Sequence, residues 1–147
     1  HTLDPLPPIE PWLMEIWRAL ERKYGEDFEL KSASGKNFKV RLGPIGSGGA
    51  VVKDASSEIR SWLLTVCRKS TAVETEAVGV AEQFSQNKLK HNHATRGYLV
   101  IRGISDGANK DKDNLYREAC VRNAMIFLQE FLAQANAGFT NVLPRIA

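Results

Sequence analysis

An apolar run that ends in a carboxylate is the first feature of this chain with chemical content. Residues 99–104 are mainly apolar and lead into Ser105 and Asp106, which Gly107 follows. A carboxyl group partly shielded from water at the end of a strand can have a raised pKa and donate a proton near neutral pH. Ser, Asp and Gly also make ordinary turns. Asp106 is therefore a candidate general acid, with a turn residue as the alternative.

A second acidic cluster, Glu74-Thr75-Glu76, follows the short apolar run 71–73. If that strand continues, the two carboxylates share a face, because alternate side chains of a strand point the same way. Such a pair could chelate a metal, accept hydrogen bonds from two ribose hydroxyls, or pair with surface lysines. No His or further Asp stands at matching spacing, so we predict that no metal is bound.

Glycines and an arginine complete the set of candidate residues. Residues 46–49, Gly-Ser-Gly-Gly, allow the backbone to approach a ligand, although they lack the spacing of either phosphate-binding fingerprint. Arg102 interrupts an apolar strand, and a buried guanidinium is costly unless it is paired. We therefore expect Arg102 to face a cleft or an acid. Ser47 and Ser105 lack the setting of a nucleophile elbow, which argues against a hydrolase triad.

The elements that must position these residues alternate along the chain. The pattern predicts helices over 11–24, from Ser56 or Ser57 to 69, over 77–84 and over 113–134, the last with its end near Gly138. It predicts strands over 38–45, 71–73 and 98–104, and a polar loop over 85–96. Alternating strands and helices indicate an α/β fold, with at least three strands in an open sheet flanked by helices. Ligands of such sheets bind outside the carboxyl ends of the strands. The three candidate clusters are therefore expected to converge on one edge.

Composition sets the class of protein. With 147 residues, 43% hydrophobic and 25% charged, the chain is expected to form one soluble domain with its own core. The net charge of +3 comes from scattered basic residues, so we expect no nucleic acid partner. Cys67 and Cys120 have no partner at ligand spacing, which favours a reduced, cytoplasmic setting. No apolar run is long enough to span a membrane, and we expect no membrane partner.

Three segments together resemble a known family. Gly-Pro-Ile-Gly-Ser-Gly-Gly-Ala-Val-Val at 43–52, Val-Glu-Thr-Glu-Ala-Val-Gly-Val at 73–80 and Leu-Val-Ile-Arg-Gly-Ile-Ser-Asp at 99–106 resemble, in order and spacing, the later part of the purine nucleoside phosphorylase and methylthioadenosine/S-adenosylhomocysteine nucleosidase superfamily. The resemblance implies an open mixed sheet flanked by helices, the phosphorylase/hydrolase-like three-layer sandwich, without its N-terminal half. Residues 1–147 would then form a single, partial nucleoside phosphorylase-like domain.

The resemblance also implies catalytic and base-binding roles. Asp106 would protonate the purine leaving group, and Arg102 would face the water or phosphate nucleophile. Ser105 would help to hold the base, which Val51 and Val52 would wall. No cofactor is implied, and phosphate stays open as a co-substrate.

For the ribose, the resemblance implies that Glu76 receives the hydroxyls, with Glu74 beside it. Thr75 takes the place where the family commonly has a methionine. A carboxylate there is chemically suitable, because positive charge develops on the ribose as the bond to the base breaks.

The function expected from these residues is cleavage of the N-ribosyl bond of purine nucleosides or nucleotides, by hydrolysis or phosphorolysis, within a larger signalling or defence protein. The alternative is a catalytically inactive nucleoside-binding or assembly module of the same fold. A third interpretation is an unrelated α/β domain with chance motif matches. A partial domain would leave a sheet edge and an apolar face open, so we expect a complementary chain or a homo-oligomer.

Overall fold

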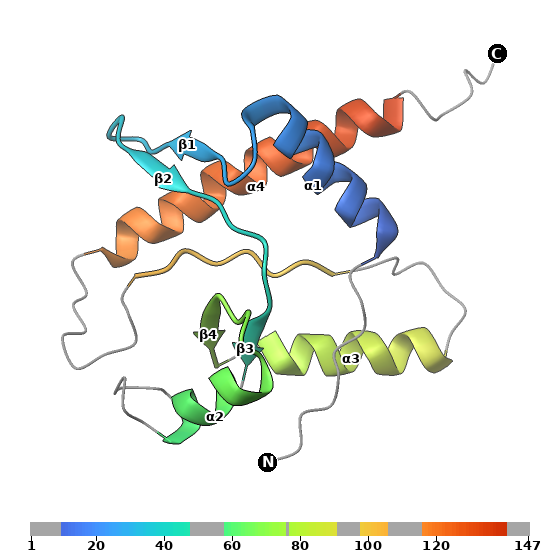
Figure 1. The fold of residues 1–147 in the computed structure, drawn as a ribbon. Helices are drawn as coiled ribbons and strands as arrows, with labels where there is room; N and C mark the ends of the chain where they lie inside the picture. The colour runs from blue at the N-terminus through green and yellow to red at the C-terminus, as the bar shows by residue number, and fades with distance from the viewer. Residues whose placement is uncertain (1–9, 48–57, 76, 91–97, 106–115, 141–147) are drawn as a thin grey trace. The chain divides into compact units, whose positions relative to one another are not determined.

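The structure, a computed structural model, describes residues 10–47, 58–75, 77–90, 98–105 and 116–140. The elements in chain order are α1 (Pro11–Tyr24), β1 (Glu29–Lys31), β2 (Asn37–Lys39), β3 (Ile45–Ser47), α2 (Glu58–Val66), β4 (Ala72–Glu74), α3 (Ala77–Lys90) and α4 (Arg117–Thr140). They form a mixed α/β fold of helices and two small sheets (Figure 1). None of the helices in these ranges is long and apolar enough to cross a membrane.

The chain divides into two compact units. The central unit contains Leu42–Val100, and the terminal unit contains Pro11–Arg41, Ile101–Ser105 and α4. The terminal unit therefore takes its parts from both sides of the central unit in the sequence. Each unit has one of the two sheets.

Helix α1 has the bounds that its sequence predicts. Apolar residues recur at helical spacing, and this stripe is buried in the terminal unit: Leu13, Ile16, Trp17 and Leu20. Pro11 stands at the first helical position, where its missing N–H costs no hydrogen bond. Gly25 ends the helix with φ +94°, and its N–H donates to the Glu21 carbonyl at 2.8 Å. A left-handed residue at this position is a common helix end, for which glycine is the favoured residue.

A β-hairpin that the sequence analysis missed follows α1. Strands β1 and β2 pair antiparallel, with Leu30 opposite Phe38. The turn closes through the Gly35 N–H, which donates to the Ser32 carbonyl at 2.9 Å, and Gly35 has φ +80°. Alternating apolar residues on both sides of a Ser- and Gly-containing segment are the signal for this hairpin.

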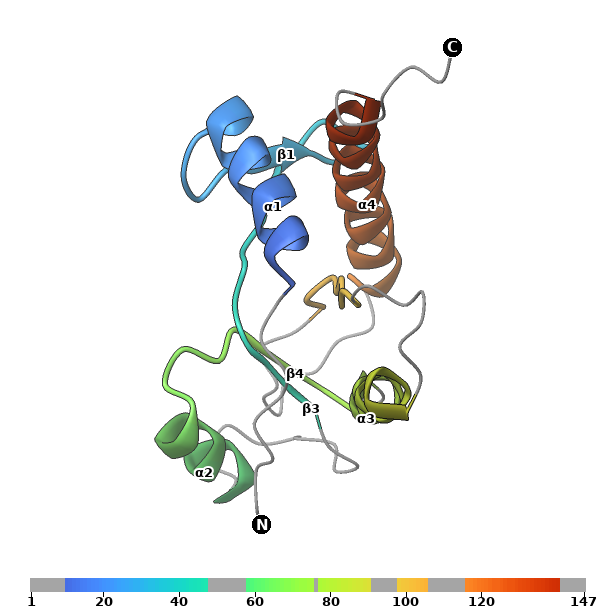
Figure 2. The same ribbon diagram turned by 90° about the vertical axis from the view of Figure 1, so that its right-hand side faces the viewer.

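The core of the terminal unit is formed by α1, the hairpin and α4. Its buried members are Leu13, Ile16, Trp17, Leu20, Phe28, Leu30, Val40, Phe127, Phe131 and Ala135. The Trp17 ring lies 5.3 Å from that of Phe28 and 6.3 Å from that of Phe127 between centroids. Figure 2 shows α1 and α4 side by side, and the aromatic rings link the two helices and the hairpin. Tilted and edge-on rings at these separations attract one another in addition to burying apolar area.

The predicted strand over 98–104 is wrong, because residues 98–105 form no helix or strand. The part that belongs to the terminal unit, Ile101–Ser105, lies on α4 instead of on a neighbouring strand. Ile101 packs against the core cluster, and Gly103 lies against the backbone of Cys120. Ile101 is therefore covered by the core of the terminal unit, whereas Ile104 stays exposed.

The central unit contains a β–α–β arrangement. Strands β3 and β4 pair in parallel, and α2 connects them. Gly46 allows close packing here, because a Cβ at this position would collide with the side chain of Leu63 on α2. Helix α3 begins three residues after β4 ends (Figure 1).

Several predicted bounds are corrected by the structure. The single strand expected over 38–45 is two strands, β2 and β3, which are separated by residues 40–44 and belong to different units. Pro44 lies in this interruption and has no N–H to donate to a ladder. Residues 85–90, expected in a loop, continue α3, because nothing after the buried residues Ala81 and Phe84 breaks the helix.

The remaining helix bounds also differ. Helix α2 ends at Val66 instead of at 69. The start expected at 113 lies outside the described residues, and α4 is helical from Arg117, after a turn at Tyr116. Gly138 does not end α4, which continues to Thr140, since a single glycine costs a helix only about 1 kcal/mol.

Candidate functional site

The carboxyl ends of β3 and β4 bring two polar side chains together. In the parallel register, Ser47 lies opposite Glu74, and each is the last residue of its strand. Ligands of α/β sheets bind outside this edge of the strands. Ser47 and Glu74 therefore define the candidate site in the central unit.

Glu74 is a buried carboxylate. Glu74 is only 6% exposed, and its Oε2 accepts a hydrogen bond from the backbone N–H of Ala77 at 2.8 Å. Ala77 is the first residue of α3, where backbone N–H groups have no partner inside the helix. The partial positive charge of the helix N-terminus favours an anion at this point. Glu74 thus holds the start of α3 against the end of β4.

Thr75 and Glu76 link β4 to α3. Thr75 is half-buried, and Glu76 lies outside the described residues. The strand ends at Glu74, so the condition under which Glu74 and Glu76 would share one face of a strand is not met. The chain must leave the strand here because α3 starts at Ala77.

Arg102 and Ser105 belong to the terminal unit. Arg102 is exposed, so its guanidinium does not carry the cost of burial within an apolar strand. Exposure alternates along this segment, with Arg102 and Ile104 outward and Ile101, Gly103 and Ser105 half-buried. An extended backbone places alternate side chains on opposite sides, which explains why Arg102 is exposed although its two neighbours are half-buried.

The other predicted site residues, Asp106, Val51 and Val52, lie outside the described residues. Within the ranges that are described, no group of three His, Cys, Asp or Glu side chains is arranged to hold a metal ion. The residues at the carboxyl ends of β3 and β4 provide one carboxylate and two hydroxyls, on Glu74, Ser47 and Thr75. Such groups accept and donate hydrogen bonds to a polyhydroxylated ligand.

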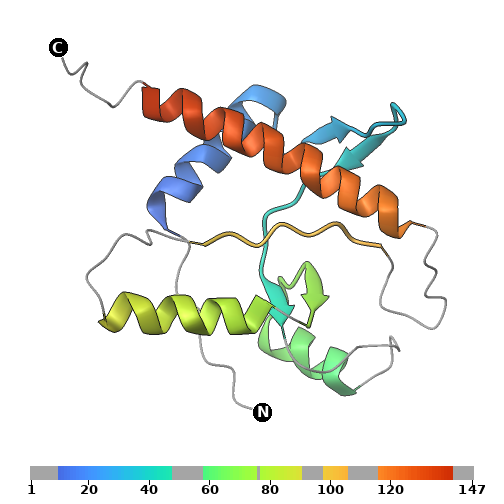
Figure 3. The same cartoon turned by 180° about the vertical axis from the view of Figure 1, so that it is seen from behind.

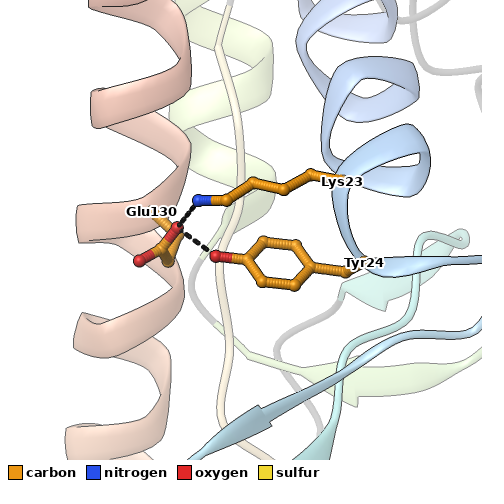
Figure 4. A network of polar contacts seen from close by, with 3 residues as sticks. All are labelled: Lys23, Tyr24 and Glu130. Atoms are coloured by element: carbon orange, nitrogen blue, oxygen red, sulfur yellow. Dashed lines mark hydrogen bonds and ion pairs between the residues drawn. The ribbon is translucent and has the colours of Figure 1, made fainter.

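A polar network that the sequence analysis missed lies in the terminal unit (Figure 4). The Tyr24 hydroxyl donates to Glu130 Oε2 at 2.6 Å, and Lys23 Nζ donates to the same oxygen at 3.1 Å. Both bonds lower the pKa of Glu130, and the bond from Tyr24 has the larger effect. The pKa of Lys23 is raised, mainly by hydrogen bonding with Tyr24 and next by hydrogen bonding with Glu130. Since the partners are more than a hundred positions apart, no local motif signals this network.

The Lys23, Tyr24 and Glu130 network has a structural role. It joins the last turn of α1 to the middle of α4. The Tyr24 ring also stacks on Phe28 at 5.5 Å between centroids, so the hydroxyl is held by a ring that belongs to the core.

Comparison of the chain with protein-family models, with curated proteins and with solved structures found no match.

Proposed function

We propose that this chain is part of a nucleoside phosphorylase-like domain that cleaves the N-ribosyl bond of purine nucleosides or nucleotides. The observation that supports it most is the pairing of Ser47 with Glu74 at the carboxyl ends of two parallel strands. This is where a sheet flanked by helices binds its ligand. The β3–α2–β4 arrangement is also the repeating unit of the proposed three-layer sandwich.

In the proposed reaction, Asp106 transfers a proton to a purine nitrogen as the bond between that base and the anomeric carbon breaks. A water or phosphate oxygen, which Arg102 faces, forms the new bond to the anomeric carbon. An attacking water releases a proton to solvent as it bonds, and solvent returns a proton to Asp106. Glu76 receives the ribose hydroxyls, with Glu74 and Thr75 beside it. A carboxylate near the ribose stabilises the positive charge that develops there.

The remaining residues of the proposal hold the base. Ser105 hydrogen bonds to the base, and Val51 and Val52 lie against it. Phosphate is a co-substrate only if the reaction is phosphorolysis, and no cofactor is needed for either route.

Product analysis tests this proposal. The full-length protein is incubated with adenosine, methylthioadenosine and ATP, with and without phosphate, and free base is measured by liquid chromatography. General acid catalysis is typically worth about 10²- to 10⁴-fold, so Asp106→Asn should lower the rate of base release by that order. Glu82→Gln, which neutralises an exposed carboxylate on α3, is the matched control and should keep the rate. Base release at the normal rate by Asp106→Ala would refute the mechanism.

A second candidate is a catalytically inactive nucleoside-binding or assembly module. The observation that favours it is the engagement of the buried Glu74 carboxylate with the N-terminus of α3, which gives this residue a structural task. Calorimetry would then show adenosine binding without base release. Loss of that binding in Glu76→Ala, but not in Glu82→Gln, would support the module.

Both candidates include association with a complementary chain or with a second copy. A two-stranded parallel sheet presents strand edges that another strand can pair with. Light scattering of the purified protein tests this part of the proposal. A well-behaved monomer that unfolds with full cooperativity would contradict it.

A further inference from the structure

The backbone of Gly103, within residues 101–105, lies in close contact with the backbone of Cys120 on α4. A Cβ added to Gly103 would overlap the carbonyl group of Cys120, and it would stand 2.9 Å from the Cys120 Cβ. Real Cβ atoms essentially never come this close to another atom. The obstacle is helix backbone, whose own hydrogen bonds resist displacement: the Cys120 N–H donates to the Tyr116 carbonyl at 2.9 Å. Only glycine fits at position 103 without a shift.

A side-chain hydrogen bond and a core contact reinforce this close approach. The Cys120 thiol donates to the backbone carbonyl of Ile104, with Sγ 2.8 Å from the oxygen. Two residues before Gly103, Ile101 packs against the core cluster of the terminal unit. Figure 3 shows the segment beside the start of α4. Three attachments therefore lie within four consecutive residues.

We infer that Gly103 and Cys120 are positioning residues for Ser105. Ser105 follows Ile104 directly, so their Cα atoms are separated by about 3.8 Å across one peptide bond. An attachment at 103 and 104 therefore restricts where Ser105 can lie. The inference rests on the proposed function, because it gives Gly103 and Cys120 the task of placing the base-binding serine.

The magnitude follows from the sensitivity of catalysis to geometry. Misplacing a group that positions the substrate by about 1 Å can lower a rate by about 100-fold. Gly103→Ala must move the backbone or α4, so we expect about 100-fold slower base release from it. Cys120→Ala removes only the thiol bond, and we expect about tenfold lower kcat, with KM changed less than about twofold. Cys120→Ser keeps a donor at the same position and should recover most of the rate.

The experiment measures kcat and KM for base release from adenosine in the full-length wild type, Gly103→Ala, Cys120→Ala and Cys120→Ser. Cys67→Ala is the matched control, because it removes the other thiol from the central unit. Hydrogen exchange of the peptide that spans 101–105 is measured in parallel, and it should be faster in Gly103→Ala and Cys120→Ala. This second readout does not depend on activity.

The outcomes separate the inference from the proposed function. Faster exchange with an unchanged kcat in Cys120→Ala would overturn the positioning role and leave the proposed function standing. A loss of kcat that Cys120→Ser does not recover would also overturn it. Absence of base release from the wild type under every condition would overturn the proposed function, and the inference with it.

Discussion

The hydroxyl of Tyr24 offers a clean test of what joins α1 to α4. Tyr24→Phe removes one oxygen atom and keeps the ring that stacks on Phe28 at 5.5 Å. The lost interaction is the bond to Glu130 Oε2 at 2.6 Å. Glu130 retains its ion pair with Lys23, so the substitution isolates a single hydrogen bond.

The expected loss can be worked from the surroundings of that bond. Hydrogen bonds to charged groups contribute about 1.5–3 kcal/mol when they are well shielded. The side chain of Glu130 is 33% exposed, so water replaces part of the lost interaction and the estimate must be reduced. We expect Tyr24→Phe to lower the free energy of unfolding by about 1 kcal/mol. For a chain of this size that corresponds to a fall in Tm of about 2–4 °C.

The assay must report on the terminal unit alone. The chain has three tryptophans, of which Trp12 and Trp17 lie in α1 and Trp62 lies in α2. In a Trp62→Phe background, fluorescence during urea unfolding therefore follows α1 and its core. A double-mutant cycle with Glu130→Gln then gives the coupling energy between the two side chains.

The pH dependence gives the sign of the effect. Hydrogen bonds from Tyr24 and then Lys23 lower the pKa of Glu130 below its ordinary value of 4.5. The bond therefore stabilises the folded state fully above that ordinary value, and its contribution disappears as pH falls through the lower pKa of the folded state. The difference between wild type and Tyr24→Phe should be largest at pH 7 and shrink in acid. Equal stabilities at pH 7, or a difference that grows in acid, would refute the reasoning.

Substitutions at three further residues test the fold and the candidate site. Leu20→Ala, at a residue with no exposure, should lower the free energy of unfolding by about 2–5 kcal/mol in the same urea assay, and a loss below about 1 kcal/mol would show that this core is wrongly described. Gly25→Ala should cost about 1 kcal/mol because alanine is strained at φ +94°, and a thermal melt that matches wild type would contradict the left-handed helix end. Glu74→Ala removes the acceptor for α3 and should destabilise the central unit by about 1 kcal/mol, followed through Trp62, whereas Glu74→Gln keeps an acceptor and should lose less.

Local sequence patterns predict correctly those elements whose conformation depends least on contacts with distant parts of the chain. Helix α1 was predicted to the residue because a buried stripe, Pro11 and Gly25 all act within the helix itself. The strand over 98–104 was not predicted correctly, since an apolar extended segment has the same sequence whether it pairs with a strand or lies on a helix. The contacts that hold the segment on a helix, such as the bond from the Cys120 thiol to the Ile104 carbonyl, come from outside the segment, 16 positions away.

The same distinction applies to the candidate site. The proximity of Ser47 and Glu74 follows from one rule, that parallel strands end on the same edge, and the paired register agrees with it. The exposure of Arg102 does not follow from its apolar neighbours, because exposure depends on which side of the segment faces α4. Contacts that join distant parts of the chain, such as Tyr24 with Glu130, require the fold before they can be found.

The nesting of the central unit within the sequence of the terminal unit has a consequence for the order of folding. Contact between α1 and α4 closes a loop of more than a hundred residues, since Tyr24 and Glu130 are separated by 106 positions. The cost of loop closure rises with the logarithm of the free chain length, by about 0.6 kcal/mol for each doubling. Contacts of such sequence separation also slow folding. If Leu42–Val100 folds first, more than half of that loop is already compact, so we expect α1 to remain unpaired with α4 until the central unit has formed.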